Sequence, residues 1–175
     1  MKRILIIMIL ILAFAMNANA KSWVDNWTVN GIPVKRFVNA EPMEYVELGS
    51  GMLASFAIHW LGHVIWLELN DKPWKQDGLT EVIDGYLTDT EANEFGNAGF
   101  LAQCLVGTAI KFTDFNDTMF STGYHIGTFL EISTYPLIHG NDVGDIGDMD
   151  RDGNGTTEHL AYTAWSTLLL IDYKK

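Results

Sequence analysis

The sequence is short of cysteine and of basic residues. Cys104 is the single cysteine among 175 residues, so no intrachain disulfide can form and stability must come from packing or bound metal. Its apolar neighbours in FLAQCLVG predict a buried thiol. Lys and Arg number 11 against 22 Asp and Glu, and the net charge of −11 excludes a nucleic-acid partner and argues against an anionic membrane surface. The sequence also has no G-x-S-x-G, P-loop or dinucleotide-binding motif.

The first twenty residues are typical of a secretory signal peptide. Lys2 and Arg3 precede an apolar run over residues 4–14, and Ala18-Asn19-Ala20 offers small residues where a signal peptidase inspects the chain. We therefore predict cleavage after Ala20 and export to the periplasm or the extracellular space. Position 21 is not Cys, so lipid attachment is not expected there. About 44% of the mature chain is apolar, which is enough for one sizeable core.

The mature chain predicts a mainly α fold, in which about four helices follow a small N-terminal β-hairpin. Residues 21–42 form the β element, because Asn30-Gly31 lies between two short β-branched runs and favours a two-residue turn with positive φ. Pro33 confines its strand to an edge. Residues 43–175 form the helical domain.

Helix boundaries in this domain follow from capping residues, glycine and proline. Residues 138–155 contain five Gly and five Asp, so we expect an irregular acidic loop there. A short helix is expected at residues 79–86. The long helices are expected at 43–69, from about 88 to 110, from about 118 to a point before Pro136, and from Thr156-Thr157 onward.

Two segments approach the length of a membrane span. Residues 51–66 contain no Asp, Glu, Lys or Arg, and residues 119–138 contain only Glu131. Both segments carry histidine in their interior, and charged residues are dense between them. A soluble helical core is therefore the favoured interpretation, and association with a membrane is the alternative.

The most informative residues are His59 and His63 in AIHWLGHVIW. On a helix they project from one face with about 6 Å of axial rise, a spacing at which two imidazoles can hold one zinc ion. The same face continues to Leu67, which cannot bind metal, so a third ligand must come from elsewhere in the chain. The leading candidates are Asp142 and Asp145, followed by His125, His139 and His159.

HWLGH resembles the HELGH form of the HExxH signature of zinc metallopeptidases, especially the integral-membrane, site-2-protease-like group. Residues 97–103, NAGFLAQ, are similar to the AG-x-x-x-Q helix of that group, and Asp142-Val143-Gly144-Asp145 lies late in the chain, where the group supplies a carboxylate ligand. The resemblance spans roughly residues 50–165 through short matches. It implies a zinc site that joins the two histidines to one of these aspartates.

Trp60 stands where these enzymes have the glutamate that serves as general base. Losing a positioned base typically costs on the order of 10² to 10⁴-fold in rate, so we expect a non-catalytic relative. An active hydrolase would need a displaced carboxylate, such as Glu47, Glu131 or Asp142. If no metal binds, both histidines are core residues that donate hydrogen bonds to neighbouring helices.

Residues 148–153, DMDRDG, match D-x-D-x-D-G, the first half of an EF-hand calcium loop. The twelfth position of such a loop should be Glu but is His159, and Glu158 comes one residue early. The segment resembles dockerin-like extracellular loops, in which one loop precedes one helix. A solvated loop, or one whose Asp142 and Asp145 join the histidines, is the alternative. The predicted calcium ligands are Asp148, Asp150, Asp152, Asn154, Thr156 and Glu158.

These residues predict three functions, in order of preference. The first is an exported metal-binding protein that holds zinc and is related to, but not active as, an HExxH peptidase. The second is a calcium-stabilised structural or interaction module with ordinary core histidines. The third is an active metallohydrolase with a displaced base. The sequence identifies no protein or peptide partner.

Overall fold

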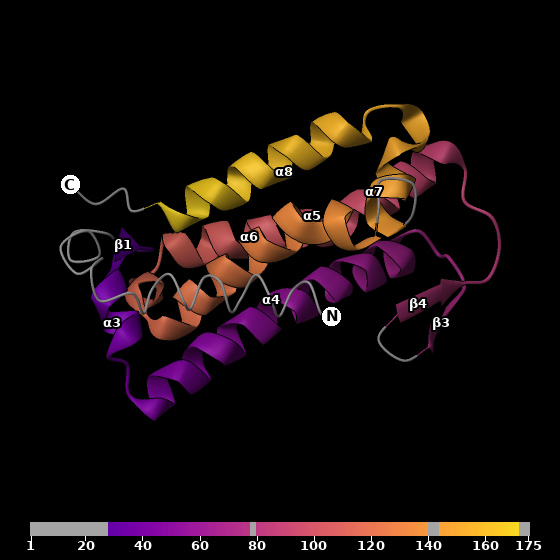
Figure 1. Ribbon diagram of the computed structural model, residues 1–175. Coiled ribbons are helices and arrows are strands. Elements are labelled where there is room, and N and C mark those ends of the chain that lie inside the picture. The colour runs from indigo at the N-terminus through magenta and orange to yellow at the C-terminus, as the bar shows by residue number, and fades with distance from the viewer. Residues whose placement is uncertain (1–27, 78–79, 140–143, 172–175) are drawn as a thin grey trace.

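The computed structural model describes residues 28–77, 80–139 and 144–171. The predicted signal peptide and Asp142 lie outside these residues. The described chain is mainly α-helical, as predicted, with a short antiparallel hairpin ahead of the helices (Figure 1). A second hairpin connects the first two long helices.

The long helices are α4 (Pro42–Leu69), α5 (Asp89–Lys111), α6 (Met119–His139) and α8 (Gly155–Leu170). Consecutive long helices run in opposite directions, so α4 runs parallel to α6 (Figure 1). Helices α5 and α6 form a middle layer, α4 packs on one side of it and α8 on the other. The described residues also form the short helices α3 (Val34–Val38) and α7 (Gly144–Met149), and 3₁₀ turns at Asp114–Asp117 and Asp150–Asp152.

The N-terminal hairpin has the predicted turn. Strand β1 (Thr28–Val29) pairs with β2 (Ile32–Pro33), and the turn residues Asn30 and Gly31 have φ angles of 50° and 76°. The Asn30 backbone N–H donates to the carbonyl of Leu170 at 2.9 Å, which ties the hairpin to the end of α8. The hairpin therefore closes one end of the bundle.

Capping determines where α5 begins, as the sequence predicted. The Thr88 hydroxyl accepts the backbone N–H of Glu91, whose carboxylate in turn accepts the backbone N–H of Thr88 at 2.9 Å. This reciprocal pair satisfies two N–H groups that the helix itself cannot pair.

Close contact between α4 and α6 fixes the rotation of α4. A Cβ at Gly51 would overlap the carbonyl of Phe120, and a Cβ at Gly123 would overlap the carbonyl of Leu48. Only glycine permits this approach of two backbones. The histidines, which lie two and three turns beyond Gly51, consequently face the interior.

Residues 79–86 do not form the predicted short helix. Strand β3 (Trp74–Asp77) pairs with β4 (Thr80–Ile83), and Trp74 lies opposite Ile83. Thr80, Val82 and Ile83 are β-branched and favour strand geometry. Trp74 and Ile83 also pack against the core cluster at the end of α4, so tertiary packing stabilises the hairpin.

Helix α6 was predicted to end before Pro136, but it continues to His139. Proline offers no N–H to the carbonyl four residues earlier, which here belongs to Ile132. Nε2 of His159, on α8, lies 2.7 Å from that oxygen and donates the missing hydrogen bond. The neighbouring helix therefore makes a proline inside α6 tolerable.

The expectation of an irregular loop over residues 138–155 is also wrong, because α7 occupies the middle of this segment. Gly96 of α5 lets the α7 backbone approach so closely that a Cβ there would overlap the carbonyl of Asp145. Met149, at the end of α7, is fully buried in a cluster with Phe100 and Cys104, whose predicted burial is confirmed. Tertiary packing here outweighs the low helix propensity of Gly and Asp.

Candidate metal centre

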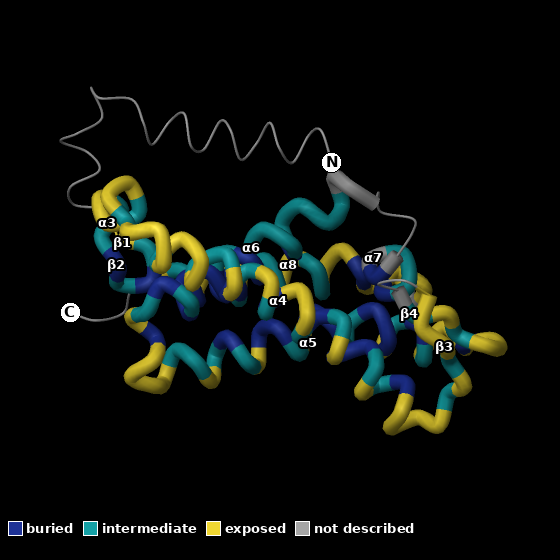
Figure 2. Tube along the Cα trace, turned by 90° about the horizontal axis from the view of Figure 1, so that it is seen from below, coloured by how far each residue is buried: buried dark blue, intermediate teal, exposed yellow. Residues whose placement is uncertain are grey.

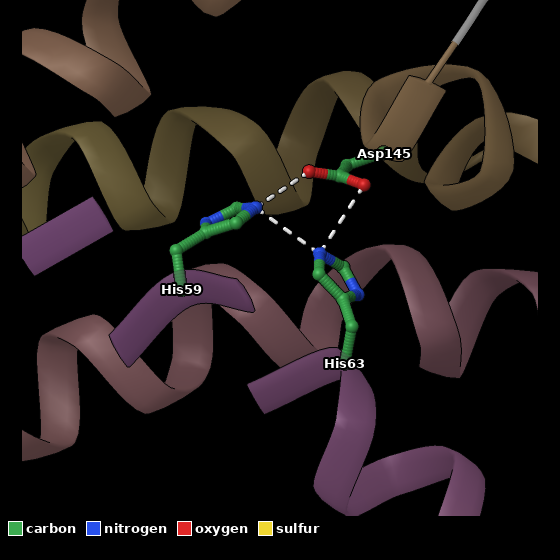
Figure 3. A group of neighbouring side chains, drawn as sticks. All are labelled: His59, His63 and Asp145. Carbon is green, nitrogen blue, oxygen red and sulfur yellow. Dashed lines mark hydrogen bonds and ion pairs between the residues drawn. The ribbon is translucent and has the colours of Figure 1, made fainter. Parts of the chain in front are cut away.

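His59 and His63 lie on the buried side of α4, as their spacing predicted. Their relative exposures are 8% and 2%. The two Nε2 atoms are 3.1 Å apart and both face α7, as Figure 3 shows. The pair is therefore aimed at one shared point.

Asp145, in the first turn of α7, meets this pair from the opposite side (Figure 3). Its Oδ2 lies 2.8 Å from Nε2 of His59, and its Oδ1 lies 3.3 Å from Nε2 of His63. One ligand atom from each of the three side chains lies within 4.8 Å of the others. The three residues form a buried group that could hold a metal ion.

The donor set suits a divalent transition metal. Ligands bound to zinc at about 2.0–2.1 Å are about 3.3 Å apart when the geometry is tetrahedral. The two Nε2 atoms are 3.1 Å apart, and each lies within 3.3 Å of a different oxygen of Asp145, so with one carboxylate oxygen as the ligand the three atoms lie within 4.8 Å of one another. Two imidazoles and a carboxylate suit zinc and other first-row transition metals, and three protein ligands leave one tetrahedral position for water or another ligand.

Gln103 of α5 determines the protonation of His59. The Gln103 amide nitrogen donates to the carbonyl of Ser55 at 3.1 Å and to the carboxylate of Glu131 at 2.5 Å. Its amide oxygen is therefore the atom that lies 3.2 Å from Nδ1 of His59, and that Nδ1 must carry hydrogen. Metal-binding histidines are typically held this way, with the second nitrogen donating to an acceptor.

In the absence of metal, a proton must lie between His59 and Asp145. Nδ1 of His59 already donates to Gln103, yet Nε2 lies at hydrogen-bond distance from a carboxylate oxygen. A shared proton makes this contact favourable. A bound cation would take its place, so metal binding is expected to release about one proton.

The histidines also set the acidity of Asp145. Burial alone would raise the pKa of this carboxyl, but hydrogen bonds and charge from His59 and His63 hold its pKa well below the ordinary value. Burial raises the pKa of Asp148, and Arg151, whose Nε lies 3.5 Å from the carboxylate, opposes that shift. The pKa values of the two acids of α7 are therefore shifted in opposite directions.

Gly99 of α5 closes one side of the centre. A Cβ at this position would lie 2.6 Å from Nε2 of both His59 and His63. The helix backbone thus approaches the metal-facing nitrogens as closely as any residue could. Gly99 and Gln103 both belong to the segment that resembles the AG-x-x-x-Q helix.

The second imidazole is held by packing. Nδ1 of His63 is buried and has no hydrogen-bond partner among the described residues. The ring lies 4.6 Å from the ring of Phe95 and 4.8 Å from that of His59, measured between centroids. Its orientation therefore depends on α5 and α4.

A cavity of about 730 Å³ borders the centre and is lined by all three candidate ligands. Apolar side chains of α4, α5 and α6 form much of its wall, Trp60 among them. Glu81, Glu131 and Asp148 contribute further carboxylates, and no Lys or Arg lines the part of the cavity that the structure describes.

The carboxylates that the sequence suggested as a displaced general base lie at different places relative to the histidines. Oε1 of Glu131 lies 3.8 Å from Nδ1 of His59, behind the ring and away from the metal-facing nitrogen. Glu47 is exposed and lies twelve residues before His59 on the same helix, about 18 Å along its axis. Asp142 lies outside the described residues. Glu131 is therefore placed to orient His59 through Gln103.

Two of the other candidate third ligands have different roles. Nε2 of His125 lies 3.4 Å from the side-chain oxygen of Asn116, in a separate buried polar cluster, and His159 is bonded to Ile132. The side chain of His139 lies outside the described set.

The described members of the predicted calcium loop diverge. Asp148 faces the cavity, Asp150 is exposed, and Glu158 accepts hydrogen bonds from the amides of Asn93 and Asn97 on α5. Asn154 and Thr156 are exposed at the start of α8, and the side chain of Asp152 is not described. Among described residues, the group of His, Asp and Glu side chains close enough to share an ion is His59, His63 and Asp145. Calcium binding stays a prediction.

The sequence did not predict a role for Tyr135 in the centre. The Tyr135 hydroxyl accepts the backbone N–H of Asp145 at 3.1 Å and thereby positions the first turn of α7. Nothing in the pattern of α6 marks Tyr135 as different from other aromatic core residues. Only the resemblance to the AG-x-x-x-Q helix pointed to Gln103, and its contacts explain why an amide is needed there.

No protein-family model matches this chain, and neither the characterised proteins nor the solved structures contain a significant match.

Proposed function

We propose that this protein binds a divalent transition metal, with zinc preferred, through His59, His63 and Asp145. The observation that carries the proposal is the convergence of three buried side chains from α4 and α7, whose ligand atoms lie within 4.8 Å of one another. The hydrogen bond from His59 to Gln103, which leaves Nε2 free for the metal, supports it independently.

We further propose that the centre does not carry out peptidase chemistry by the HExxH mechanism. Trp60 lines the cavity beside the histidines and offers no base, and Glu131 lies behind His59. The centre then serves to hold metal or to stabilise the bundle. The signal-peptide pattern of residues 1–20 supports a location outside the cytoplasm.

The test is the metal content of the purified full chain by elemental analysis. We expect about one zinc per chain, and loss of that metal in His59→Ala, His63→Ala and Asp145→Asn. Asp150→Asn is the matched control, because Asp150 lies in the same segment but is exposed and apart from the centre. A wild-type chain without transition metal after refolding with excess zinc would overturn the proposal.

An active metallohydrolase is the second candidate, and the cavity favours it. Asp148 lines this cavity together with the candidate ligands, and burial raises its pKa, as a general base requires. Hydrolysis of a generic peptide or ester that a chelator stops, and that Asp148→Asn abolishes while zinc stays bound, would support this candidate. Metal binding without any such activity would support the non-catalytic centre.

A further inference from the structure

The outward face of α4 is apolar along most of the helix. Leu61 and Ile65 are 40% and 48% exposed, and Leu53, which is 70% exposed, lies at the border of the cavity beside the candidate metal centre. A helix on the surface of a water-soluble bundle normally presents charged and polar residues on its outward side. Figure 2 shows exposed and intermediate residues along the whole length of this helix.

Helix α4 is long enough and apolar enough to cross a membrane, and only 28% of its most apolar window is buried inside the bundle. Residues 48–67 contain no Asp, Glu, Lys or Arg. Twenty helical residues span about 30 Å, which equals the thickness of a bilayer's hydrocarbon core.

The other long helices continue this uncharged belt. Residues 95–110 of α5 and 159–170 of α8 contain no Asp, Glu, Lys or Arg, and residues 119–139 of α6 contain only Glu131. That carboxylate faces inward and accepts a hydrogen bond from Gln103. We define the belt as residues 48–67, 95–110, 119–139 and 159–170.

Five hydroxyl groups of the belt are hydrogen-bonded inside their own helices. Each of five Ser and Thr side chains donates to the carbonyl four residues earlier, including Thr167, which is exposed. A hydroxyl in contact with hydrocarbon must find such a partner, whereas one in water need not. These residues are Thr108, Ser133, Thr134, Thr163 and Thr167.

Ionised side chains gather at the two ends of the bundle. The end that carries β3 and β4 and the end that carries β1 and α3 lie on opposite sides of the belt (Figure 1). Charged residues at the first end include Glu68, Asp71, Lys75, Asp84 and Glu91, and those at the second include Lys35, Arg36, Glu44, Lys111 and Asp114.

The interior histidines and the charged segments between the helices are both compatible with a bundle in a membrane. His59 and His63 lie inside the bundle, where polar groups of membrane proteins are found. The dense charges between the apolar segments lie at the bundle ends, where they would face water on either side of a membrane.

We infer that the bundle is seated in a lipid bilayer, with hydrocarbon chains against the outward faces of α4 and α8. A second protein copy could cover one face, but α4 and α8 lie on opposite sides of the middle layer and both expose leucines, including Leu61 and Leu168 (Figure 1). Lipid surrounds all sides at once. Because the net charge is negative, we expect the association with the membrane to depend on contact with hydrocarbon and not on anionic headgroups.

The test uses the full chain in phosphatidylcholine vesicles, with bimane attached to single introduced cysteines. Native Cys104 is fully buried and should not react. Leu61→Cys on α4 and Ala164→Cys on α8 probe opposite sides of the belt, and Tyr86→Cys, at a residue that is 92% exposed outside the belt, is the control. Doxyl-labelled phosphatidylcholine reports contact with hydrocarbon, and aqueous iodide reports contact with water.

We expect doxyl lipid to remove most of the emission at positions 61 and 164 and to leave position 86 bright, with iodide acting in the opposite way. Quenching of positions 61 and 164 by iodide would overturn the inference, including the case in which residues 1–20 alone anchor a water-soluble bundle. Protection of both positions from both quenchers would also overturn it, because protein would then cover the belt. The readout is independent of bound metal, so it stands or falls separately from the zinc proposal.

Discussion

Gly99 of α5 faces Nε2 of His59 so closely that a Cβ would lie 2.6 Å from the nitrogen. We expect Gly99→Ala to displace both imidazoles and to lower zinc affinity by at least about tenfold, in a competition assay with a chromogenic chelator. Gly49→Ala is the control, because a Cβ at Gly49 meets nothing within 4 Å. Equal zinc affinity in the two variants would show that Gly99 does not border a metal site.

Gln103 fixes the ring of His59 through Nδ1, so loss of the Gln103 amide should lower the affinity for the metal without removing a ligand. Gln103→Met keeps the volume but removes the acceptor, and we expect affinity to fall by about 10- to 100-fold. Ser55→Ala removes one acceptor of the Gln103 amide and leaves its bond to Glu131 in place, so its effect should be smaller. Wild-type affinity in Gln103→Met would contradict the role assigned to this amide.

Metal binding should release a proton from the contact between His59 and Asp145. Calorimetric titration of zinc near neutral pH, in buffers of different ionisation enthalpy, should give a release of about one proton per ion. Asp145→Asn, which removes a ligand, should give neither zinc binding nor proton release. Affinity should fall on acidification, since protons then compete with the ion. A binding enthalpy that does not depend on the buffer would contradict this account.

The low pKa of Asp145 predicts how acid affects the metal-free protein. A carboxyl with a lowered folded pKa stabilises the fold above its unfolded value of about 3.8, and this contribution is lost as pH falls through the folded pKa. The melting temperature of the metal-free wild type should therefore drop progressively as the pH falls below about 5. Asp145→Asn should start lower and lose less over the same range. Parallel curves for the two proteins would show that Asp145 is not the responsible group.

The histidine pair could be predicted because helix geometry is local. Four residues separate His59 from His63, and an apolar sequence around them indicates a helix whose buried side holds both rings. The choice of Asp145 depends on α7, which forms only because Gly96 and Tyr135 let it dock on the bundle. Tyr135 is only ten residues from Asp145, but Gly96 lies on another long helix, about fifty residues away in sequence. The local pattern of Gly and Asp indicated a loop.

The prediction that α6 ends before Pro136 was wrong for a related reason. A helix is expected to end before a proline, but here His159 of α8 donates the hydrogen bond that Pro136 cannot. Likewise, Thr80–Ile83 form a strand because β3, with Trp74 opposite Ile83, supplies a partner across the hairpin. Local preferences predicted the four long helices well, whereas the exceptions depend on partners that are distant in sequence.

The repair of α6 can be tested by a double-mutant cycle. His159→Ala leaves the buried carbonyl of Ile132 without a donor and should lower the free energy of unfolding by about 1–3 kcal/mol. Pro136→Ala restores a backbone N–H that can bond the same oxygen. His159→Ala made in the Pro136→Ala background should therefore cost about 1 kcal/mol less than in the wild type, measured by chemical denaturation. Lost packing of the imidazole on Phe100 is common to both backgrounds and cancels. Equal costs in the two backgrounds would mean that His159 stabilises the bundle by packing alone.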